Sequence, residues 1–321
     1  MKVLIGLLCL WSALMSYEIK KIQSGEYEAT LIYSPLANND KSIFYIHGFN
    51  DYVFHEELIG KINQAGYGFF GVELHNYGRN ITKTTKYPYY FDDVSEFFPE
   101  ILEAVEYIKM TYSIQDITIL AHSQGGLIAS LLSDKYPNIA NRLILNSPFF
   151  DFYLPFSTQM VLPFLAFFGQ YEPHFNTNKT SVVSKFGESV SNQYLGEWNI
   201  DERYKSISPS PPIYLGWLRA VYQAQNELQK GLNIKMPTLI LHSNKSAYEA
   251  SIDMKNEQDV NTLSTSDVVL DVEDIKKYGA NIGEDVTLLA VKDAMHDVFL
   301  SRKAVRDKAF DEMMGWIKKS Q

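Results

Sequence analysis

The chain has 321 residues, of which 46% are hydrophobic and 21% charged, and this ordinary globular composition excludes disorder, collagen and coiled coil as the main architecture. Lys and Arg number 29 against 38 Asp and Glu, a net charge of −9, and no basic cluster could follow a phosphate backbone, so we expect no nucleic-acid partner. The single cysteine, Cys9, excludes an internal disulfide and a cysteine-based zinc site, and we expect neither a cofactor nor a metal ion.

The first predicted element is an apolar segment at the N-terminus. Residues 3–15 are apolar apart from Ser12, and Lys2 precedes them. This run is too short to cross a hydrocarbon core of roughly 30 Å, so it is typical of a signal peptide over residues 1–16. We therefore expect a secreted or extracytoplasmic protein. The alternative is a cytoplasmic protein that carries an apolar N-terminal segment.

Further along the chain, short apolar runs alternate with amphipathic stretches. The runs have the length and composition of buried strands and comprise residues 43–46, 68–74, 117–121, 143–145, 238–241 and 286–291. Helices are predicted over residues 94–110, 126–135 and 272–278. This alternation predicts an α/β fold with a mostly parallel sheet flanked by helices.

Residues 149–233 interrupt the alternation. They are rich in proline and aromatic residues and contain no run that predicts a strand. We interpret them as a largely helical cap inserted over the sheet, which leaves residues 17–148 and 234–321 as the core. The apolar stretches at residues 150–156 and 161–168 are suited to covering an acyl pocket. The alternative is that their aromatic side chains form the core of the cap itself.

The sharpest motif is ITILAHSQGGL at residues 117–127. A buried strand leads into a tight turn with Ser123 at its apex, a helix follows at once, and Ala121 and Gly125 are small enough for the turn to close. Such a nucleophile elbow lifts the serine hydroxyl clear of the sheet and aims the positive end of the helix dipole at the reacting centre. The pattern therefore predicts Ser123 as a catalytic nucleophile.

A serine nucleophile needs a base, and the chain has seven histidines. His296 follows the last predicted strand and precedes a helical C-terminus, so its loop can reach back to the elbow, and we expect it to be the base. His122 adjoins the serine but points away from the elbow tip, and His47 shapes a loop. The remaining histidines are His242, which ends a strand, and His55, His75 and His174, which lack context.

An aspartate must orient this base, and it is expected after the strand at residues 238–241. The candidates there are Asp253, Asp259, Asp267, Asp271 and Asp274. Asp267 precedes His296 by 29 residues, enough for one turn, one helix and one strand. We predict Asp267 as the acid and keep Asp271 as the first alternative. The other reading of each aspartate is a helix cap or a surface charge.

A tetrahedral intermediate also needs backbone donors for its oxyanion. The loop HGFND at residues 47–51 follows a strand beside the elbow and can present the N–H of Phe49. The residue after the nucleophile, Gln124, provides a second N–H. We predict these two amides as the oxyanion hole, with an ordinary strand-to-loop turn as the alternative reading of the loop.

Seven strings carry a wider resemblance: YIHGFNDY at 45–52, YGRN at 77–80, HSQGGL at 122–127, NSP at 146–148, GWLRA at 216–220, DVVLD at 267–271 and MHDVFLS at 295–301. Together they resemble the α/β-hydrolases of the serine aminopeptidase-like, monoglyceride lipase and lysophospholipase group, over about residues 18–318. The resemblance implies the α/β-hydrolase fold and a triad of Ser123, Asp267 and His296. One departure is the stretch of about 25 residues before Asp267, where close relatives of monoglyceride lipase place the acid within a few residues of the strand.

The expected function is hydrolysis of a carboxylic ester, of lysophospholipase or monoacylglycerol-lipase type, through an acyl-enzyme on Ser123. The expected substrate is a small-molecule or lipid ester, transient contact with a membrane surface is a further expectation, and the sequence leaves the oligomeric state open. A prolyl-type serine aminopeptidase is the first alternative, for which the cap carboxylates Glu172, Glu188 and Glu197 are available. An inactive binding protein on a hydrolase scaffold is the second, and the intact Ser123 and His296 argue against it.

Overall fold

The computed structural model of the chain describes residues 17–178, 183–252 and 256–320. The predicted signal peptide, residues 1–16, lies outside the described residues. Within the described ranges, no helix combines the length and the apolar composition that crossing a bilayer requires.

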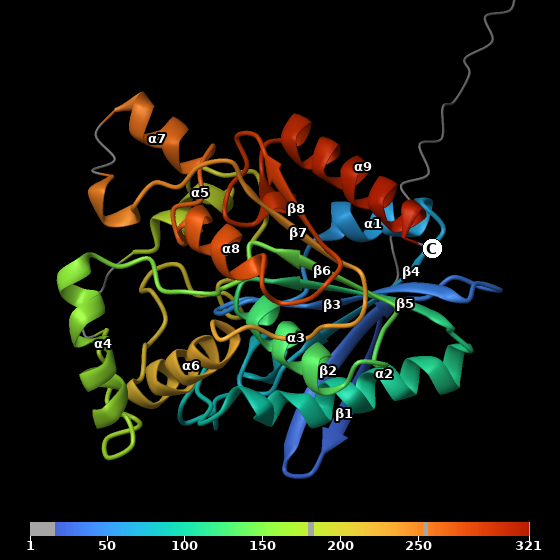
Figure 1. Cartoon of the computed structure of the whole chain (residues 1–321), viewed down its shortest axis with the longest axis horizontal. Helices are drawn as coiled ribbons and strands as arrows, with labels where there is room; N and C mark the ends of the chain where they lie inside the picture. Colours follow the sequence, from blue (N-terminus) through green and yellow to red (C-terminus); the bar gives the residue numbers. More distant parts are fainter. Residues whose placement is uncertain (1–16, 179–182, 253–255, 321) are drawn as a thin grey trace, which may run out of the picture.

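A mixed sheet forms the centre of the molecule (Figure 1), and in the described part of the chain it has eight strands in the order β1-β2-β4-β3-β5-β6-β7-β8. The strands are β1 (Glu18–Ser24), β2 (Tyr27–Ser34), β3 (Lys41–Ile46), β4 (Gly68–Glu73), β5 (Asp116–His122), β6 (Arg142–Asn146), β7 (Thr238–Ser243) and β8 (Val286–Val291). β2 pairs antiparallel with β1 and β4, whereas each neighbouring pair from β4 across to β8 is parallel. This sheet with its flanking helices confirms the predicted fold class.

All six predicted strands occur in the sheet, as β3 to β8. The antiparallel pair of β1 and β2 is a finding of the structure, because no strand is predicted before residue 43. β1 lies at the edge of the sheet and buries only Ile22. Because its other residues are at least partly exposed to solvent, they can be charged or polar, and the strand has no apolar run. A search for apolar runs therefore misses an exposed edge strand.

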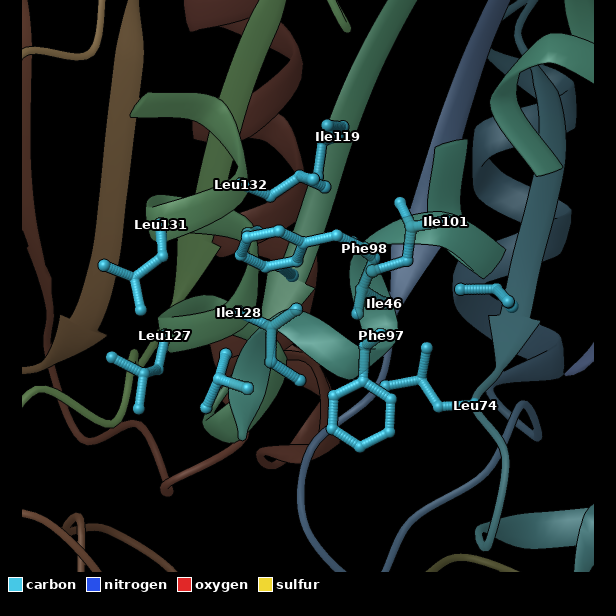
Figure 2. Close-up of a cluster of buried hydrophobic side chains, with 14 of the residues drawn as sticks. Ile46, Leu74, Phe97, Phe98, Ile101, Ile119, Leu127, Ile128, Leu131 and Leu132 are labelled. Carbon is cyan, nitrogen blue, oxygen red and sulfur yellow. The ribbon is translucent and has the colours of Figure 1, made fainter. Parts of the chain in front are cut away.

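Helices cover both faces of the sheet (Figure 1). Outside the region between β6 and β7, the helices are α1 (Glu56–Gln64), α2 (Phe98–Tyr112), α3 (Gln124–Lys135), α7 (Glu257–Leu263), α8 (Val272–Gly279) and α9 (Lys303–Lys319), and the short 3₁₀ helices are η1 (Gly78–Asn80), η2 (Val94–Phe97), η3 (Glu249–Ser251) and η4 (Val298–Leu300). α1 and α9 share one buried cluster, and α2, α3 and α8 contribute to the cluster on the opposite face. Figure 2 shows this second cluster, in which side chains of α2 and α3 meet Ile46 of β3 and Ile119 of β5.

Between β6 and β7 the chain leaves the sheet, and the described residues there add no strand to it. The helices of this region are α4 (Phe156–Phe168), α5 (Lys185–Val190) and α6 (Leu215–Leu228). α4 and α6 lie side by side at one end of the molecule (Figure 1), and α6 also packs on α3. The region between β6 and β7 therefore contacts the helix that follows Ser123.

Candidate active site

Ser123 lies at the turn between β5 and α3 with a backbone φ of 52°. This left-handed conformation is uncommon for a residue with a Cβ atom and stores strain. The turn also packs tightly, because a Cβ atom on Gly125 would lie 2.3 Å from the carbonyl oxygen of His47. A strand, a strained serine and a helix in direct succession have the geometry of a nucleophile elbow.

The structure brings the serine together with the predicted base and acid. His296, which follows β8, has its Nε2 atom 3.0 Å from the Ser123 hydroxyl oxygen. Its Nδ1 atom lies 3.0 Å from Oδ2 of Asp267. Because a carboxylate only accepts hydrogen bonds, Nδ1 carries the proton, which leaves Nε2 free to accept the proton of the serine hydroxyl.

Asp267 is fully buried and held by the backbone as well as by the histidine. Its Oδ1 atom accepts hydrogen bonds from the N–H groups of Val269 at 2.9 Å and Leu270 at 2.8 Å. The alternative acid, Asp271, instead caps α8 by accepting a hydrogen bond from the Glu273 N–H at 3.0 Å. The geometry thus distinguishes Asp267, which faces the histidine, from Asp271, which caps the N-terminus of α8.

The predicted oxyanion donors lie on two sides of the serine. The loop after β3 approaches the elbow closely, since a Cβ atom on Gly48 would be 3.0 Å from the Cβ atom of Ser123, and Phe49 follows it. Gln124 is the first residue of α3, where backbone amides have no acceptor within the helix. Phe49 and Gln124 thus both belong to segments next to Ser123, and Phe49 lines both pockets at the serine.

The side chain of Gln124 has a role that the sequence analysis missed. It is completely buried, its Nε2 donates to the Tyr77 hydroxyl at 2.9 Å, and its Oε1 accepts from the indole N–H of Trp217 at 2.9 Å. Trp217 belongs to α6. The residue after Ser123 thus connects the elbow to the inserted region through two side-chain hydrogen bonds.

A second connection to the inserted region, also missed, joins the loop after β3 to residues 201–206. Asn50 exchanges two hydrogen bonds with the backbone of Ser206, at 2.7 and 2.8 Å. The Lys205 ammonium lies 2.9 Å from the Asp51 carboxylate, and both side chains are buried. Burial raises the pKa of the Asp51 carboxyl, but the charge of Lys205 together with nearby histidines outweighs burial and holds it below its usual value.

Two histidines near the serine have structural contacts. His47 is fully buried and accepts a hydrogen bond at Nε2 from the Leu74 N–H at 3.1 Å. His122 donates from Nδ1 to the carbonyl oxygen of Asn146 at 3.2 Å. Burial lowers the pKa of His122 to about 4, so this side chain is neutral near pH 7. These contacts agree with the structural interpretation of both residues.

Asp297, next to the predicted base, is a further buried carboxylate. It accepts hydrogen bonds from His55 Nε2 at 3.1 Å and from the Asn146 side-chain amide at 2.7 Å. Burial raises the pKa of this carboxyl, but the adjacent His122 and these two hydrogen bonds hold it well below its usual range. Asp297 thus keeps its negative charge although it is buried next to the predicted base. No motif in the sequence predicts this role.

Two pockets meet at Ser123. The first has a volume of about 470 Å³ and is mainly apolar, with Phe152, Leu162, Leu165 and Trp217 in its lining. The second has a volume of about 270 Å³, and most of its surface is apolar. We call it the polar pocket because more than half of its lining residues are polar, namely Asn50, His122, Ser123, Asn178, Ser184, Lys205, Ser206, Ser210, Glu249 and His296. A larger cavity of about 720 Å³, between α1 and residues 193–204, shares no lining residue with either and is remote from the serine.

The carboxylates expected to hold a substrate amine are not at these pockets. Glu172, Glu188 and Glu197 line neither pocket, and Glu197 pairs with Arg306 at 2.8 Å. Among the residues that the structure describes, no three His, Cys, Asp or Glu side chains are grouped so that they could hold a metal ion.

The mostly parallel sheet, the elbow and the inserted helices define the chain as an α/β-hydrolase. Residues 37–251 match the Hydrolase_4 family, described as serine aminopeptidase, S33, and the chain belongs to this family. The expected family resemblance is therefore confirmed. The matched segment includes Ser123 and ends before Asp267 and His296.

Two relatives agree with this assignment. A probable lysophospholipase L2 of Haemophilus influenzae is 28% identical over 190 residues, which cover 54% of this chain and 56% of the relative, little more than half of its length. A monoglyceride lipase homolog of Monkeypox virus is 26% identical over 215 residues, covering 65% of this chain and 72% of the relative.

Solved structures share the fold at low sequence identity. A soluble variant of monoglyceride lipase from Saccharomyces cerevisiae has a TM-score of 0.68 at 16% identity, covering 95% of this chain and 97% of its own. A thermostable carboxyl esterase from Bacillus coagulans has a TM-score of 0.64 at 12% identity, covering 95% and 99%. At these identities the likeness supports the fold alone.

Proposed function

We propose that this hydrolase is a serine esterase that cleaves esters with an apolar acyl chain through an acyl-enzyme on Ser123. The observation that carries the proposal is the hydrogen-bonded series Ser123–His296–Asp267, located where an apolar pocket and a polar pocket meet. The polar pocket is suited to the leaving alcohol and the apolar pocket to the acyl chain.

In the proposed reaction, the Ser123 hydroxyl oxygen attacks the ester carbonyl while His296 Nε2 takes its proton. Asp267 stabilises the resulting imidazolium, and the N–H groups of Phe49 and Gln124 donate to the oxyanion. Collapse of the intermediate breaks the ester C–O bond, and His296 returns the proton to the leaving alcohol. After the alcohol leaves, His296 takes a proton from water, whose oxygen attacks the acyl-enzyme. Collapse of this second intermediate breaks the bond to the Ser123 oxygen, His296 returns the proton to that oxygen, and the carboxylic acid is released.

Replacement of Ser123 by alanine tests this assignment. Because the hydroxyl is the nucleophile, turnover of p-nitrophenyl esters should fall on the order of a million-fold, and labelling by a fluorophosphonate should disappear. Ser95→Ala is a matched control, because this exposed serine of η2 lines neither pocket, and it should keep both properties. Wild-type turnover in folded Ser123→Ala would refute the mechanism.

The apolar pocket supports acyl esters of lysophospholipase or monoacylglycerol-lipase type, and the similarity to relatives with these names favours the same class. Each buried methylene contributes about 0.8 kcal/mol, so kcat/KM should rise about fourfold per added methylene until the pocket is full. The measurement is a series of p-nitrophenyl esters of increasing chain length. A flat or falling series would contradict acyl binding in this pocket.

An aminopeptidase is the second candidate, because the family is described by that activity. The three cap glutamates that this alternative would use do not line the pockets at Ser123. Efficient release of nitroaniline from proline 4-nitroanilide, with poor turnover of every ester, would favour the aminopeptidase.

The outer face of α4 supports a contact with a membrane surface. The helix contains no charged residue, and large apolar side chains on it are exposed, Phe164 by 66%. Its inner residues Leu162 and Leu165 line the apolar pocket, so a lipid could pass from the surface into that pocket. Phe164→Ser should weaken flotation with phosphatidylcholine vesicles. Met110→Ser, which removes a side chain that is 78% exposed on α2, should not, and equal flotation of both variants would refute the contact.

The proposed export of the protein depends on the apolar residues 3–15. The mature protein recovered from its own cell should begin near residue 17. Mass spectrometry of the N-terminus would measure this, and an intact Met1 would refute cleavage.

A further inference from the structure

The segment between β7 and Asp267, which departs from the family pattern in length, forms part of the wall of the site. It contains η3 and α7, and it contacts the inserted helix α5. The Lys185 ammonium donates to the backbone oxygens of Glu249, at 2.9 Å, and of Ile252. On α5, the Phe186 N–H donates to Oε1 of Glu249 at 3.1 Å, and the Phe186 ring packs edge-on against His296.

Glu249 lies where the apolar and polar pockets meet. It lines both pockets together with Ser123, and of the described residues that line either pocket it is the only aspartate or glutamate. Its carboxylate accepts the Phe186 N–H but forms no ion pair with any residue that the structure describes. One negative charge is therefore available to a substrate bound at the serine.

Two cations lie near Glu249, and neither forms an ion pair with its carboxylate in the described part of the chain. The Lys185 ammonium donates to the backbone oxygens of Glu249 and Ile252. Lys205 is the one lysine or arginine among the described residues lining either pocket, and its ammonium is already paired with the buried Asp51 carboxylate at 2.9 Å. A carboxylate without its own cation repels an anion in a partly enclosed pocket and accepts hydrogen bonds from hydroxyl groups.

We propose that Glu249 selects the leaving group: esters of uncharged, hydroxyl-bearing alcohols such as glycerol are accepted, and esters whose alcohol carries a phosphate are disfavoured. This inference rests on the proposed esterase function and narrows it to monoacylglycerol-type substrates over lysophospholipids with an anionic head group.

The test compares two substrates with the same acyl chain, 1-lauroylglycerol and lauroyl-lysophosphatidic acid, both below the concentrations at which they aggregate. The wild type should prefer the glycerol ester in kcat/KM by on the order of tenfold or more. Glu249→Gln keeps the shape and an acceptor for the Phe186 N–H but removes the charge. It should narrow the preference about tenfold, mainly through faster turnover of the phosphate ester.

Glu257→Gln is the matched control, because this exposed glutamate is on α7 of the same segment and lines neither pocket. It should leave the preference unchanged. Choline laurate compared with its uncharged isostere, 3,3-dimethylbutyl laurate, isolates the effect of charge: the wild type should prefer the choline ester, and Glu249→Gln should not.

The outcomes separate this inference from the function on which it rests. If Glu249→Gln is labelled by a fluorophosphonate as the wild type is, but keeps the same substrate ratio within twofold, the selection by Glu249 is refuted and the esterase function stands. If the wild type hydrolyses none of the four esters, the esterase function itself fails, and the inference fails with it.

Discussion

Replacement of Lys205 by methionine should lower the free energy of unfolding by about 3–5 kcal/mol, because it leaves the Asp51 carboxylate buried without a cation. The Lys205 and Asp51 side chains are only 6% and 1% exposed, and their charged atoms lie 2.9 Å apart. Oδ2 of Asp51 has no hydrogen-bond partner among the described residues, so Lys205 provides most of the compensation for burying this carboxylate. Removing one partner of a buried ion pair therefore lowers the free energy of unfolding by more than the intact pair raises it, because the remaining charge is buried without compensation.

Equilibrium unfolding in urea, followed by tryptophan fluorescence, measures this loss. Arg203→Ala is the control on the same segment: its ion pair with Asp201 is exposed, with 77% of the arginine side chain accessible, so its removal should cost at most about 1 kcal/mol. Adding Asp51→Asn to Lys205→Met should recover much of the loss, because the unpaired charge is then gone. A Lys205→Met variant as stable as Arg203→Ala would refute this reasoning.

The same substitution should also affect catalysis. Lys205 and Ser206 hold the loop that presents the Phe49 N–H to the proposed oxyanion. Because a misplaced oxyanion donor weakens the transition state more than the bound substrate, kcat of Lys205→Met should fall more than KM changes.

Three further outcomes are expected. Asp267→Asn should lower kcat by something like ten-thousand-fold in an ester assay through loss of the histidine tautomer, whereas Asp271→Asn should keep most activity; the reverse ranking would assign the acid to Asp271. Gly125→Ala should lose more than about 2 kcal/mol of stability, because the added Cβ would lie 2.3 Å from a backbone oxygen. Gly315→Ala is the control and should be neutral or stabilising, because no atom lies within 4 Å of its added Cβ. Equal urea midpoints of the two variants would contradict the packing argument. Burial lowers the pKa of His75, but its hydrogen bond to Glu100 and the nearby Glu96 carboxylate, 3.8 Å from Nε2, outweigh burial and raise this pKa from 6.5 to about 9. The stabilisation by His75 is therefore complete below pH 6.5 and lost as the pH rises through about 9. The stability advantage of the wild type over His75→Asn should therefore shrink by roughly 1–3 kcal/mol from about pH 6 to about pH 9.5, and a constant advantage would contradict this assignment.

The parallel core could be predicted because its strands are buried on both faces. A strand covered by helices on each side must be apolar along its length, and residues 43–46 and 117–121 have that property. β1 could not be found in this way, since it buries only Ile22. The pairing of β1 with β2 compensates for its weak apolar pattern, and that pairing is visible only in the folded chain.

The proposed catalytic residues differ in how much of the surrounding sequence is needed to predict each of them. Ser123 could be predicted from contiguous sequence, because the strand, the small neighbours and the helix that shape an elbow adjoin one another. His296 needed only its place after the last strand. Asp267 depended on counting elements across a long segment, and the contact that distinguishes it from Asp271 is its 3.0 Å approach to His296.

The sequence by itself determined the fold class, the elbow, and Ser123 and His296 of the proposed triad, because apolar runs, turn residues and element order are properties of neighbouring positions. The choice between Asp267 and Asp271 needed the contact with His296. Only the tertiary structure decided which charges face the substrate. Lys205 is paired with Asp51 although 154 residues separate them, and Glu249 lines the two pockets at the serine while the cap glutamates do not. The physical reason is that burial and pairing of a charge depend on how distant segments pack, and no local pattern records that packing.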